Sequence, residues 1–366
     1  MNLIERLKLS GRILLKGAQP PNSGGLKQRE VPAITAGEVA EAKAFFPLDK
    51  FFIFGHARSG TTLLTRLVRL HPQVHCNYQA HFFTRQPLLE ALVANDEVGA
   101  WLSRRSNRWN QGRDLSPLAL RAVADFIMER DARRVGKGGL GCRVGDKSPN
   151  SLLDGEAVHL LNKVYPDAKL IFIVRDGRDA VISHRFQAFI EDIRLSTEDA
   201  RIRQEFVQNP ESFLNGQRSI FTEKILRQEA EGWVRNVVDT EQAAEAVGYK
   251  RSDTSSISMA GAASMQNLQY HHLRYEDLLQ DPGKEMRQFW SFLGVDPDAP
   301  GLQEALNNEM QQNPDADWQQ QKAGEIANAL QKGKRGGWRE LLTTQDQRVF
   351  WSIAGDTLAA WGYPQI

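Results

Sequence analysis

Two short apolar runs, each followed by a turn that contains glycine, stand out in the hydrophobic pattern of the chain. Phe51–Phe54 is apolar and stops at Gly55, and residues 170–174 are apolar and precede Asp176-Gly177. Short runs without polar alternation are typical of parallel strands that helices cover on both faces. After the first turn, apolar residues recur at helical spacing until Pro72. The pattern predicts an α/β fold, a single domain with a central parallel sheet flanked by helices.

The other segments give coarser signals. Residues 1–43 are expected to form an N-terminal helix and an extended lead-in, and residues 44–366 one domain. The apolar stripe of the first helix either packs on the domain or lies on a membrane surface. Within residues 190–268, residues 191–248 are mostly helical and charged, and residues 251–266 are rich in Ser, Ala, Gly and Met. This composition predicts a helical insertion or lid with a mobile loop.

The first strand–turn–helix unit is suited to binding an anion. Unpaired backbone amides and the positive end of the helix dipole meet where such a helix begins. Gly55 and Gly60 fit the nucleotide-triphosphatase pattern G-x-x-x-x-G-K-[ST], but Thr61 replaces the lysine, which disfavours an ATPase, a GTPase or a P-loop kinase. The loop offers instead the planar donor Arg58 and three hydroxyls. A structural corner that binds no ligand is the alternative interpretation.

The same loop resembles that of a known family. G-x-x-R-S-G-T-T, residues 55–62, is similar to the 5′-phosphosulfate loop of sulfotransferases that use 3′-phosphoadenosine 5′-phosphosulfate (PAPS), with Ala57 in place of the usual proline. The resemblance implies a P-loop-like sulfotransferase fold with helical insertions, and PAPS as co-substrate. The residues it implies for the 5′-phosphosulfate are Arg58, Ser59, Gly60, Thr61 and Thr62.

Two further motifs match the family in the same order. G-D-K-S-P places Lys147 where the family has a lysine beside the transferred sulfuryl group; a surface lysine in a turn is the alternative. Arg175 follows the second apolar run, and Ser183 lies at the spacing of the family's arginine–serine site for the 3′-phosphate. A capping network of arginine and aspartate is the alternative for Arg175.

Weaker matches lie toward the carboxyl end. R-Y-E-D-L resembles a family segment whose tyrosine lies near the nucleotide, so Tyr275 either contacts the nucleotide or packs between strand and helix. Lys332 and Gly333 resemble the family loop that folds over the 3′-phosphate, although Gln331 and Gly337 replace its arginine and aspartate.

The sequence does not fix a general base. In the protein-tyrosine sulfotransferases a glutamate stands at the position of Gln79, which cannot accept a proton at neutral pH. His81 and His75 flank it, and His81 is preferred because a histidine pKa near ~6.5 suits a base. A structural role for His81 and an acid from elsewhere are the alternatives. The predicted catalytic residues are therefore Lys147, Arg58 and His81.

Two polar stretches are interpreted separately. Residues 75–83 are too polar for a core strand and too aromatic for a random loop, so an acceptor could lie there. His271 and His272 are expected to be a half-exposed pair on a strand. No third ligand lies at metal spacing from this pair, so we predict no metal site.

Composition bears on partners and compartment. Lys and Arg number 46 against 45 Asp and Glu, a net charge of +1, which disfavours a nucleic-acid binder. Cys76 and Cys142 form neither a zinc site nor a disulfide framework, which favours a reducing compartment. No apolar run reaches the ~18 residues that span a bilayer, and charges interrupt any signal-peptide core. We expect a cytoplasmic protein.

The leading hypothesis is a PAPS-dependent sulfotransferase. Arg58, Lys147 and the helix N-terminus would neutralise the charge on the leaving group, so the step is expected to need no Mg²⁺. The acceptor, whether small molecule, lipid, glycan or protein side chain, is not identified by the sequence. A non-catalytic nucleotide-binding or scaffold protein of the same fold is the alternative.

Overall fold

The structure is a computed structural model. It describes residues 31–84, 93, 95–104, 106, 108–150, 155–191, 195–249, 269–312 and 337–365. The predicted first helix, the predicted mobile loop, and the predicted site residues Lys332 and Gly333 lie outside these residues.

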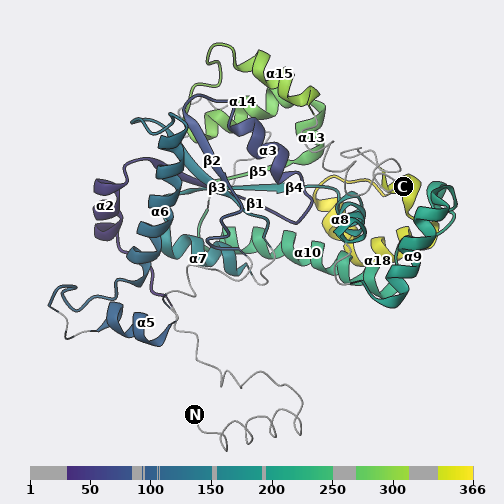
Figure 1. Ribbon diagram of the computed structural model, residues 1–366, viewed down its shortest axis with the longest axis horizontal. Coiled ribbons are helices and arrows are strands. Elements are labelled where there is room, and N and C mark those ends of the chain that lie inside the picture. The colour runs from purple at the N-terminus through teal and green to yellow at the C-terminus, as the bar shows by residue number, and fades with distance from the viewer. Residues whose placement is uncertain are drawn as a thin grey trace, which may run out of the picture.

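A parallel sheet forms the centre of the fold (Figure 1). Within the described residues it has five strands: β1 (Asp49–Gly55), β2 (Val74–Tyr78), β3 (Arg143–Lys147), β4 (Lys169–Val174) and β5 (Tyr270–Arg274). Their order is β2-β3-β1-β4-β5, and every neighbouring pair is parallel. The predicted central parallel sheet is confirmed. Strands lie on both sides of β1, so the loop after β1 occupies the switch point where open α/β sheets bind ligands.

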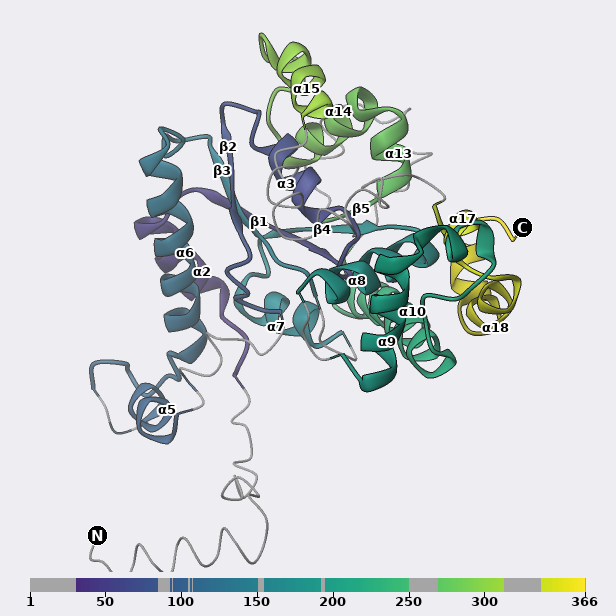
Figure 2. The ribbon, with the colours of Figure 1, turned by 45° about the vertical axis from the view of Figure 1, so that its right-hand side comes forward.

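Alternate side chains of the strands pack into two hydrophobic cores on opposite faces of the sheet. Phe51 and Ile53 of β1 point to one face, and Phe52 and Phe54 to the other. The first face is covered by α3 (Thr61–Val68), α14 (Pro282–Leu293) and α15 (Leu302–Gln311). The second is covered by α6 (Ser116–Arg134), α7 (Glu156–Val164), α8 (Gly177–Glu191) and α10 (Glu223–Ala246). Figure 2 shows α3, α14 and α15 on one side of the sheet and α7 and α10 on the other.

The helices begin and end at local signals in the sequence. Pro117 lies in the first turn of α6, where its missing backbone N–H costs no helical hydrogen bond. Asp281 caps α14 by accepting a hydrogen bond of 2.9 Å from the Lys284 amide, and Gly294 ends this helix at a φ of 76°. These caps explain why the strand–helix units could be read from sequence.

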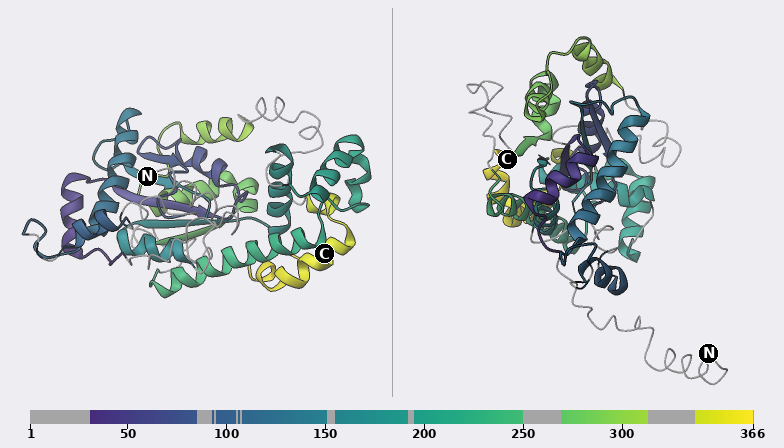
Figure 3. Two further views of the ribbon diagram at one scale, coloured as in Figure 1. Left: turned by 60° about the horizontal axis from the view of Figure 1, so that its bottom comes forward. Right: turned by 90° about the vertical axis from the view of Figure 1, so that its left-hand side faces the viewer.

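The remaining helices surround this frame. They are α2 (Ala36–Phe45), α5 (Asp96–Ser103), α9 (Thr197–Gln208), α13 (Tyr275–Gln280), α17 (Trp338–Leu341) and α18 (Thr344–Ala360), with 3₁₀ turns at Pro210–Ser212 and Leu214–Gly216. Figure 3 shows α10 beside α18, and Trp233 of α10 is fully buried. Residues 197–246 are mainly helical, as predicted. The role of this segment as a lid and the domain boundary after residue 43 are still predictions. None of the helices in the described part is long and apolar enough to cross a membrane.

The interpretation of residues 75–83 as too polar for a core strand was wrong for β2, because four of its five residues are buried. This strand lies at one edge of the sheet, where Val74 and Cys76 enter the core. His75 Nε2 contacts Asn77 Oδ1 at 2.9 Å, and Asn77 Nδ2 donates to Asp131 at 3.3 Å. Because these side chains satisfy one another, a polar sequence can form this edge strand.

The expectation that His271 and His272 are half-exposed was also wrong. Their exposed fractions are 1% and 8%. The ring of His271 stacks on Phe292 with centroids 5.2 Å apart, and His272 meets Trp361 edge-on at 5.1 Å. Helix α14 and the end of α18 cover this strand from the two faces of the sheet, so both rings are buried.

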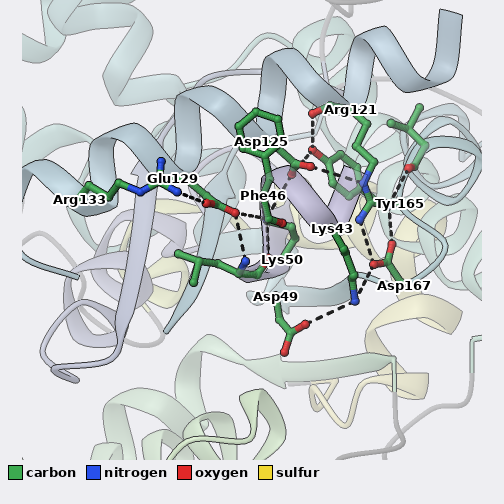
Figure 4. A network of polar contacts seen from close by, with 12 residues as sticks. Lys43, Phe46, Asp49, Lys50, Arg121, Asp125, Glu129, Arg133, Tyr165 and Asp167 are labelled. Carbon is green, nitrogen blue, oxygen red and sulfur yellow. Dashed lines mark hydrogen bonds and ion pairs between the residues drawn. The ribbon is translucent and has the colours of Figure 1, made fainter. Parts of the chain in front are cut away.

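A buried polar network lies where the strands begin (Figure 4). Lys50 Nζ at the start of β1 lies 2.9 Å from Glu129 and 3.3 Å from Asp125, both on α6. Tyr165 donates to Asp125 at 2.8 Å. The network ties α6 to the amino ends of the strands and leaves the carboxyl ends to the loops described next.

Candidate active site

The loop after β1 is held in a strained, open conformation. Gly60 is the N-cap of α3 at a φ of 89°, and Arg58 has a φ of 69°. The first amides of α3 have no partners within the helix and point out of its start. They join the positive end of the helix dipole, so this loop has the geometry of an anion site.

Tyr275 forms one wall of the loop. It begins α13 after β5, and its exposed fraction is 7%. A Cβ at Gly60 would lie 2.1 Å from Tyr275 Cδ2. Glycine is therefore required at position 60 both for its positive φ and for this close packing. Tyr275 lies between strand, helix and loop, so the two sequence interpretations of this residue are compatible.

Lys147 reaches the same loop from the end of β3. Its Nζ donates to Thr62 Oγ1 at 3.2 Å and lies 5.3 Å from the centre of the Tyr78 ring. The exposed fraction of Lys147 is 1%, so the alternative of a surface lysine is wrong. Burial lowers the pKa of Lys147, and the nearby Arg58 lowers it further. An anion here would stabilise the ammonium group.

Arg175 and Ser183 meet the loop from the other side. Ser183 Oγ accepts from Arg58 Nε at 3.1 Å, and Arg175 Nη1 donates to the Arg58 carbonyl at 3.1 Å. The predicted 5′-phosphosulfate and 3′-phosphate residues are thus in direct contact. Arg175 also lies over the Tyr275 ring, 5.0 Å from its centre.

Two buried polar atoms in this region lack partners. Ser59 Oγ and Arg175 Nε are buried and have no hydrogen-bond partner among the described residues. Buried polar atoms are rarely left in this state, because each costs about 1–3 kcal/mol. One hydroxyl and one guanidinium nitrogen are therefore available to a ligand with oxygen acceptors.

Asp146 organises the loop that carries His81, a role that the sequence did not reveal. Its Oδ1 accepts from the Ala80 amide at 3.0 Å and its Oδ2 from Ser148 Oγ at 2.6 Å. The His81 amide donates to Ser148 Oγ at 2.9 Å. Burial raises the pKa of Asp146 to about 6 despite these donors. The position of Asp146 beside Lys147 in the G-D-K-S-P motif was the available signal.

The candidate bases lie in different surroundings. Gln79 is exposed just after β2, and its backbone N–H donates to the backbone carbonyl of Lys147 at 2.6 Å. His81 Nδ1 contacts Thr84 Oγ1 at 2.8 Å. His75 is buried, and burial followed by the charge of Arg69 lowers its pKa. The structure therefore places His81, rather than His75, in the loop beside Lys147 and Ser148.

A second imidazole near Arg58 was missed by sequence reasoning. His184 Nδ1 lies 2.8 Å from Glu229 Oε2, and this contact raises the pKa of His184. Across the loop, burial lowers the pKa of His56 to about 4. His184 follows Ser183 directly, but nothing in the sequence connects it to Glu229, which lies on α10.

Two contacts fix the chain just after the predicted Lys332–Gly333 loop. The Trp338 amide donates to Asp179 at 3.0 Å, and Arg178 lies 3.8 Å from the Trp338 ring centre. Arg178 also forms an ion pair of 2.8 Å with Asp176. Asp179 therefore holds α17 against α8, next to Arg175. Among the described residues, no group of three or more His, Cys, Asp or Glu side chains is placed to hold a metal ion.

Comparison with known proteins identifies relatives of one kind. The family model described as Sulfotransferase family matches residues 50–227. Protein-tyrosine sulfotransferase A of Caenorhabditis elegans is 30% identical over 132 residues, which cover 36% of this chain and 32% of that protein. The protein-tyrosine sulfotransferase of Drosophila melanogaster is 31% identical over 132 residues, 36% of this chain and 24% of that protein. The match spans about a third or less of the length of these relatives.

Solved sulfotransferase structures also resemble the chain. One of them is a mouse sulfotransferase, SULT7A1, in complex with 3′-phosphoadenosine 5′-phosphate (PAP). It aligns with a TM-score of 0.41 and 16% identity over 88% of this chain and 89% of that chain. A sulfotransferase from Alicyclobacillus acidocaldarius aligns with a TM-score of 0.36 and 20% identity over 80% of this chain and 98% of that chain.

The region that matches the family model carries the geometry described above. It includes the loop after β1, the end of β3 with Lys147, and the pair Arg175 and Ser183. Three motifs that were recognised in the sequence therefore lie in the matched region, and all three lie at the carboxyl ends of the strands. Over this region, just under half of the chain, the protein is similar to the sulfotransferase family.

Proposed function

We propose that the chain transfers the sulfuryl group of PAPS to a hydroxyl or amine of an acceptor. One observation carries the proposal: hydrogen bonds join three of the predicted nucleotide elements at the carboxyl ends of the strands. Arg58 contacts Ser183 and Arg175, and Lys147 contacts Thr62 of the same loop. A ligand with two anionic ends fits this arrangement, because cations and hydroxyls lie on both sides of Arg58.

The residues fit the anionic groups of PAPS. The start of α3, with Ser59, Thr61 and Thr62, would hold the 5′-phosphosulfate. Arg175 and Ser183 would hold the 3′-phosphate, and the unpartnered Arg175 Nε supports this assignment. Lys332 and Gly333 stay predicted contributors, because they lie outside the described residues.

The chemistry requires charge stabilisation more than covalent work by the protein. Bound PAPS supplies an activated sulfuryl group: a bond from the acceptor oxygen or nitrogen to sulfur forms as the bond from sulfur to the bridging phosphate oxygen breaks. Lys147 and Arg58 would stabilise the negative charge that develops on this oxygen. His81 would accept the acceptor's proton, because its loop lies beside Lys147 and Ser148.

A nucleotide-binding protein that transfers nothing is the second candidate. The observation that favours it is Gln79, which is exposed where the tyrosine sulfotransferases have a glutamate and which cannot act as a base. Binding alone does not separate the two candidates, since both would hold the nucleotide. Turnover does.

Two measurements test the proposal in sequence. In thermal-shift titration, 3′-phosphoadenosine 5′-phosphate (PAP) should raise the melting temperature without added metal, and a stronger effect of ATP with Mg²⁺ would contradict the proposal. Radiolabelled PAPS is then assayed over a panel of phenols, alcohols, amines, glycans and tyrosine peptides. Transfer to any acceptor supports the enzyme, whereas PAP binding without transfer across the panel supports the second candidate.

Arg175→Ala tests the 3′-phosphate assignment. The loss of a charge-assisted hydrogen bond worth about 1.5–3 kcal/mol should weaken PAPS binding roughly tenfold to a hundredfold. Adenosine 5′-phosphosulfate lacks the 3′-phosphate, so its affinity should change little in calorimetric titration. Equal losses for both nucleotides would place Arg175 elsewhere.

A cytoplasmic location is part of the proposal. It is supported by Cys76 and Cys142, which are free, buried thiols of the kind that reducing compartments preserve. Imaging of the tagged full-length protein with a cytoplasmic marker tests it, and a secretory-pathway pattern would overturn it.

A further inference from the structure

A positively charged pocket lies along the free edge of β2. It has a volume of about 610 Å³, within the range of small-ligand pockets. The residues that matter here are Arg69, His75, Tyr78, Arg130, Asp131 and Arg134. They come from the end of α3, the edge strand and the last turns of α6, so three elements line the pocket.

The charges in this pocket favour an anion. Three arginines line it against one carboxylate, Asp131, which is already paired with Arg130 at 2.8 Å and hydrogen-bonded to Asn77. Arg130 and Arg134 are one helical turn apart on the exposed side of α6, and Nε of Arg69 is buried without a hydrogen-bond partner among the described residues. Burial lowers the pKa of His75, and the positive charge of Arg69 lowers it further.

Tyr78 joins this pocket to the proposed reaction centre. Its ring lies between the guanidinium of Arg69, 4.4 Å from the ring centre, and the ammonium of Lys147, 5.3 Å away. The ring is 42% exposed, so it is also accessible from the pocket. A molecule in the pocket therefore lies one side chain away from Lys147.

We propose that this pocket is the acceptor site and that it selects a small acceptor with an anionic group as well as its nucleophilic hydroxyl or amine. The inference rests on the proposed function. The arginines hold a carboxylate, sulfate or phosphate of the acceptor, and the nucleophile extends past Tyr78 toward Lys147. A neutral acceptor of the same shape loses the charge-assisted contacts that only the anion makes.

The test measures binding, so that it does not depend on turnover. The probes are 4-hydroxyphenylacetate and 4-hydroxyphenylacetamide, which share a shape and differ in charge. Each is titrated calorimetrically into wild type, into the Arg130→Gln/Arg134→Gln double variant, and into the control Arg348→Gln, with and without PAP. Arg348 is an exposed helical arginine on α18 and does not line the pocket.

Wild type and the control should bind the carboxylate at least about tenfold more tightly than the amide, the effect of one charge-assisted contact. In the double variant this preference should fall to within about twofold. Equal affinities in wild type, no binding of the carboxylate, or a preference that survives both substitutions would overturn the proposal. Failure of PAP to bind while the preference persists would reject the proposed sulfotransferase function and leave the anion pocket standing.

Discussion

Strained backbone at the scale of single residues gathers around Lys147. Of the four non-glycine residues with positive φ in the described part of the chain, Arg58, Gln79 and His81 lie in the two loops beside it. Such conformations cost about 1–3 kcal/mol and persist where surrounding contacts determine them. At Arg58 one such contact is the hydrogen bond from Arg175 to its carbonyl. The strain is consistent with loops that are organised before a ligand binds.

Replacing Lys147 with alanine should separate rate from binding. If Lys147 stabilises charge mainly as it develops on the leaving oxygen, kcat should fall roughly a hundredfold or more while the affinity for PAP changes only a few-fold. Steady-state kinetics and calorimetric titration measure the two effects. Lys224→Ala, at an exposed lysine on α10, is the control. Equal losses of rate and affinity would make Lys147 a binding residue.

Gly60→Ala should destabilise the protein more than a substitution at an unconstrained glycine. The new Cβ would meet Tyr275 at 2.1 Å and would also force a non-glycine residue to a φ of 89°. Gly248 has a φ of 81°, but a Cβ added there would have nothing within 4 Å, so Gly248→Ala isolates the backbone cost of about 1 kcal/mol. In urea unfolding, Gly60→Ala should lose about 1–3 kcal/mol more than this control. Similar losses would show that Tyr275 moves aside freely.

At the scale of elements, local signals predicted more than long-range contacts did. β1, β4 and α3 follow from apolar runs and a helical repeat that a few neighbouring residues define. β2 escaped prediction because its polar side chains are satisfied by α6, which is distant in sequence. The motifs placed Arg58, Lys147 and Arg175 on strand ends, but only the sheet order brings these ends together.

The same limit applies to residues that support the site. Asp146 could not be distinguished from a turn aspartate, because its role depends on the Ala80 amide from another strand end. The contact between His184 and Glu229 joins two helices that no sequence pattern links. Site residues that belong to one motif could therefore be predicted, whereas residues that act through contacts between motifs could not.

Asp146→Ala should loosen the loop after β2. The Ala80 amide and the Ser148 hydroxyl would lose their acceptor, so the backbone that carries His81 would be less ordered. Hydrogen exchange in residues 79–84 should accelerate at least about tenfold, and kcat should fall with little change in PAP affinity. Asp146→Asn keeps one acceptor and should recover part of both effects. Unchanged exchange in the alanine variant would contradict this role.

At the scale of the whole molecule, two clusters of buried ionisable groups lie at opposite ends of the strands. The network of Lys50, Asp125 and Glu129 lies at the amino ends of the strands, and the groups of the candidate site lie at their carboxyl ends. Removing one partner of a buried ion pair is costly because the other charge is left uncompensated. The amino ends of the strands are therefore anchored to α6, and the loops of the candidate site follow the carboxyl ends.

Stability should fall steeply in mild acid because of His271. Burial between α14 and the sheet lowers its pKa to about 3, and the charge of Lys169 adds to the effect. Between pH ~6.5 and about 3 the unfolded chain binds a proton that the folded protein excludes, so stability rises with pH across this window. The slope approaches about 1.36 kcal/mol per pH unit for one group.

Urea unfolding at pH 7.5 and pH 5.0 measures this dependence. Wild type should lose about 2 kcal/mol more than His271→Phe between the two pH values, since only the wild-type unfolded state gains that proton. Taking the difference within each protein cancels any packing change that the phenylalanine introduces beside Phe292. His159→Gln, at an exposed position on α7, is the control and should behave as wild type, because this side chain lies in water in both states. If His271→Phe loses as much stability as wild type, then His271 is not held neutral by the fold, and other groups, such as His56 with its pKa lowered to about 4, govern the acid response.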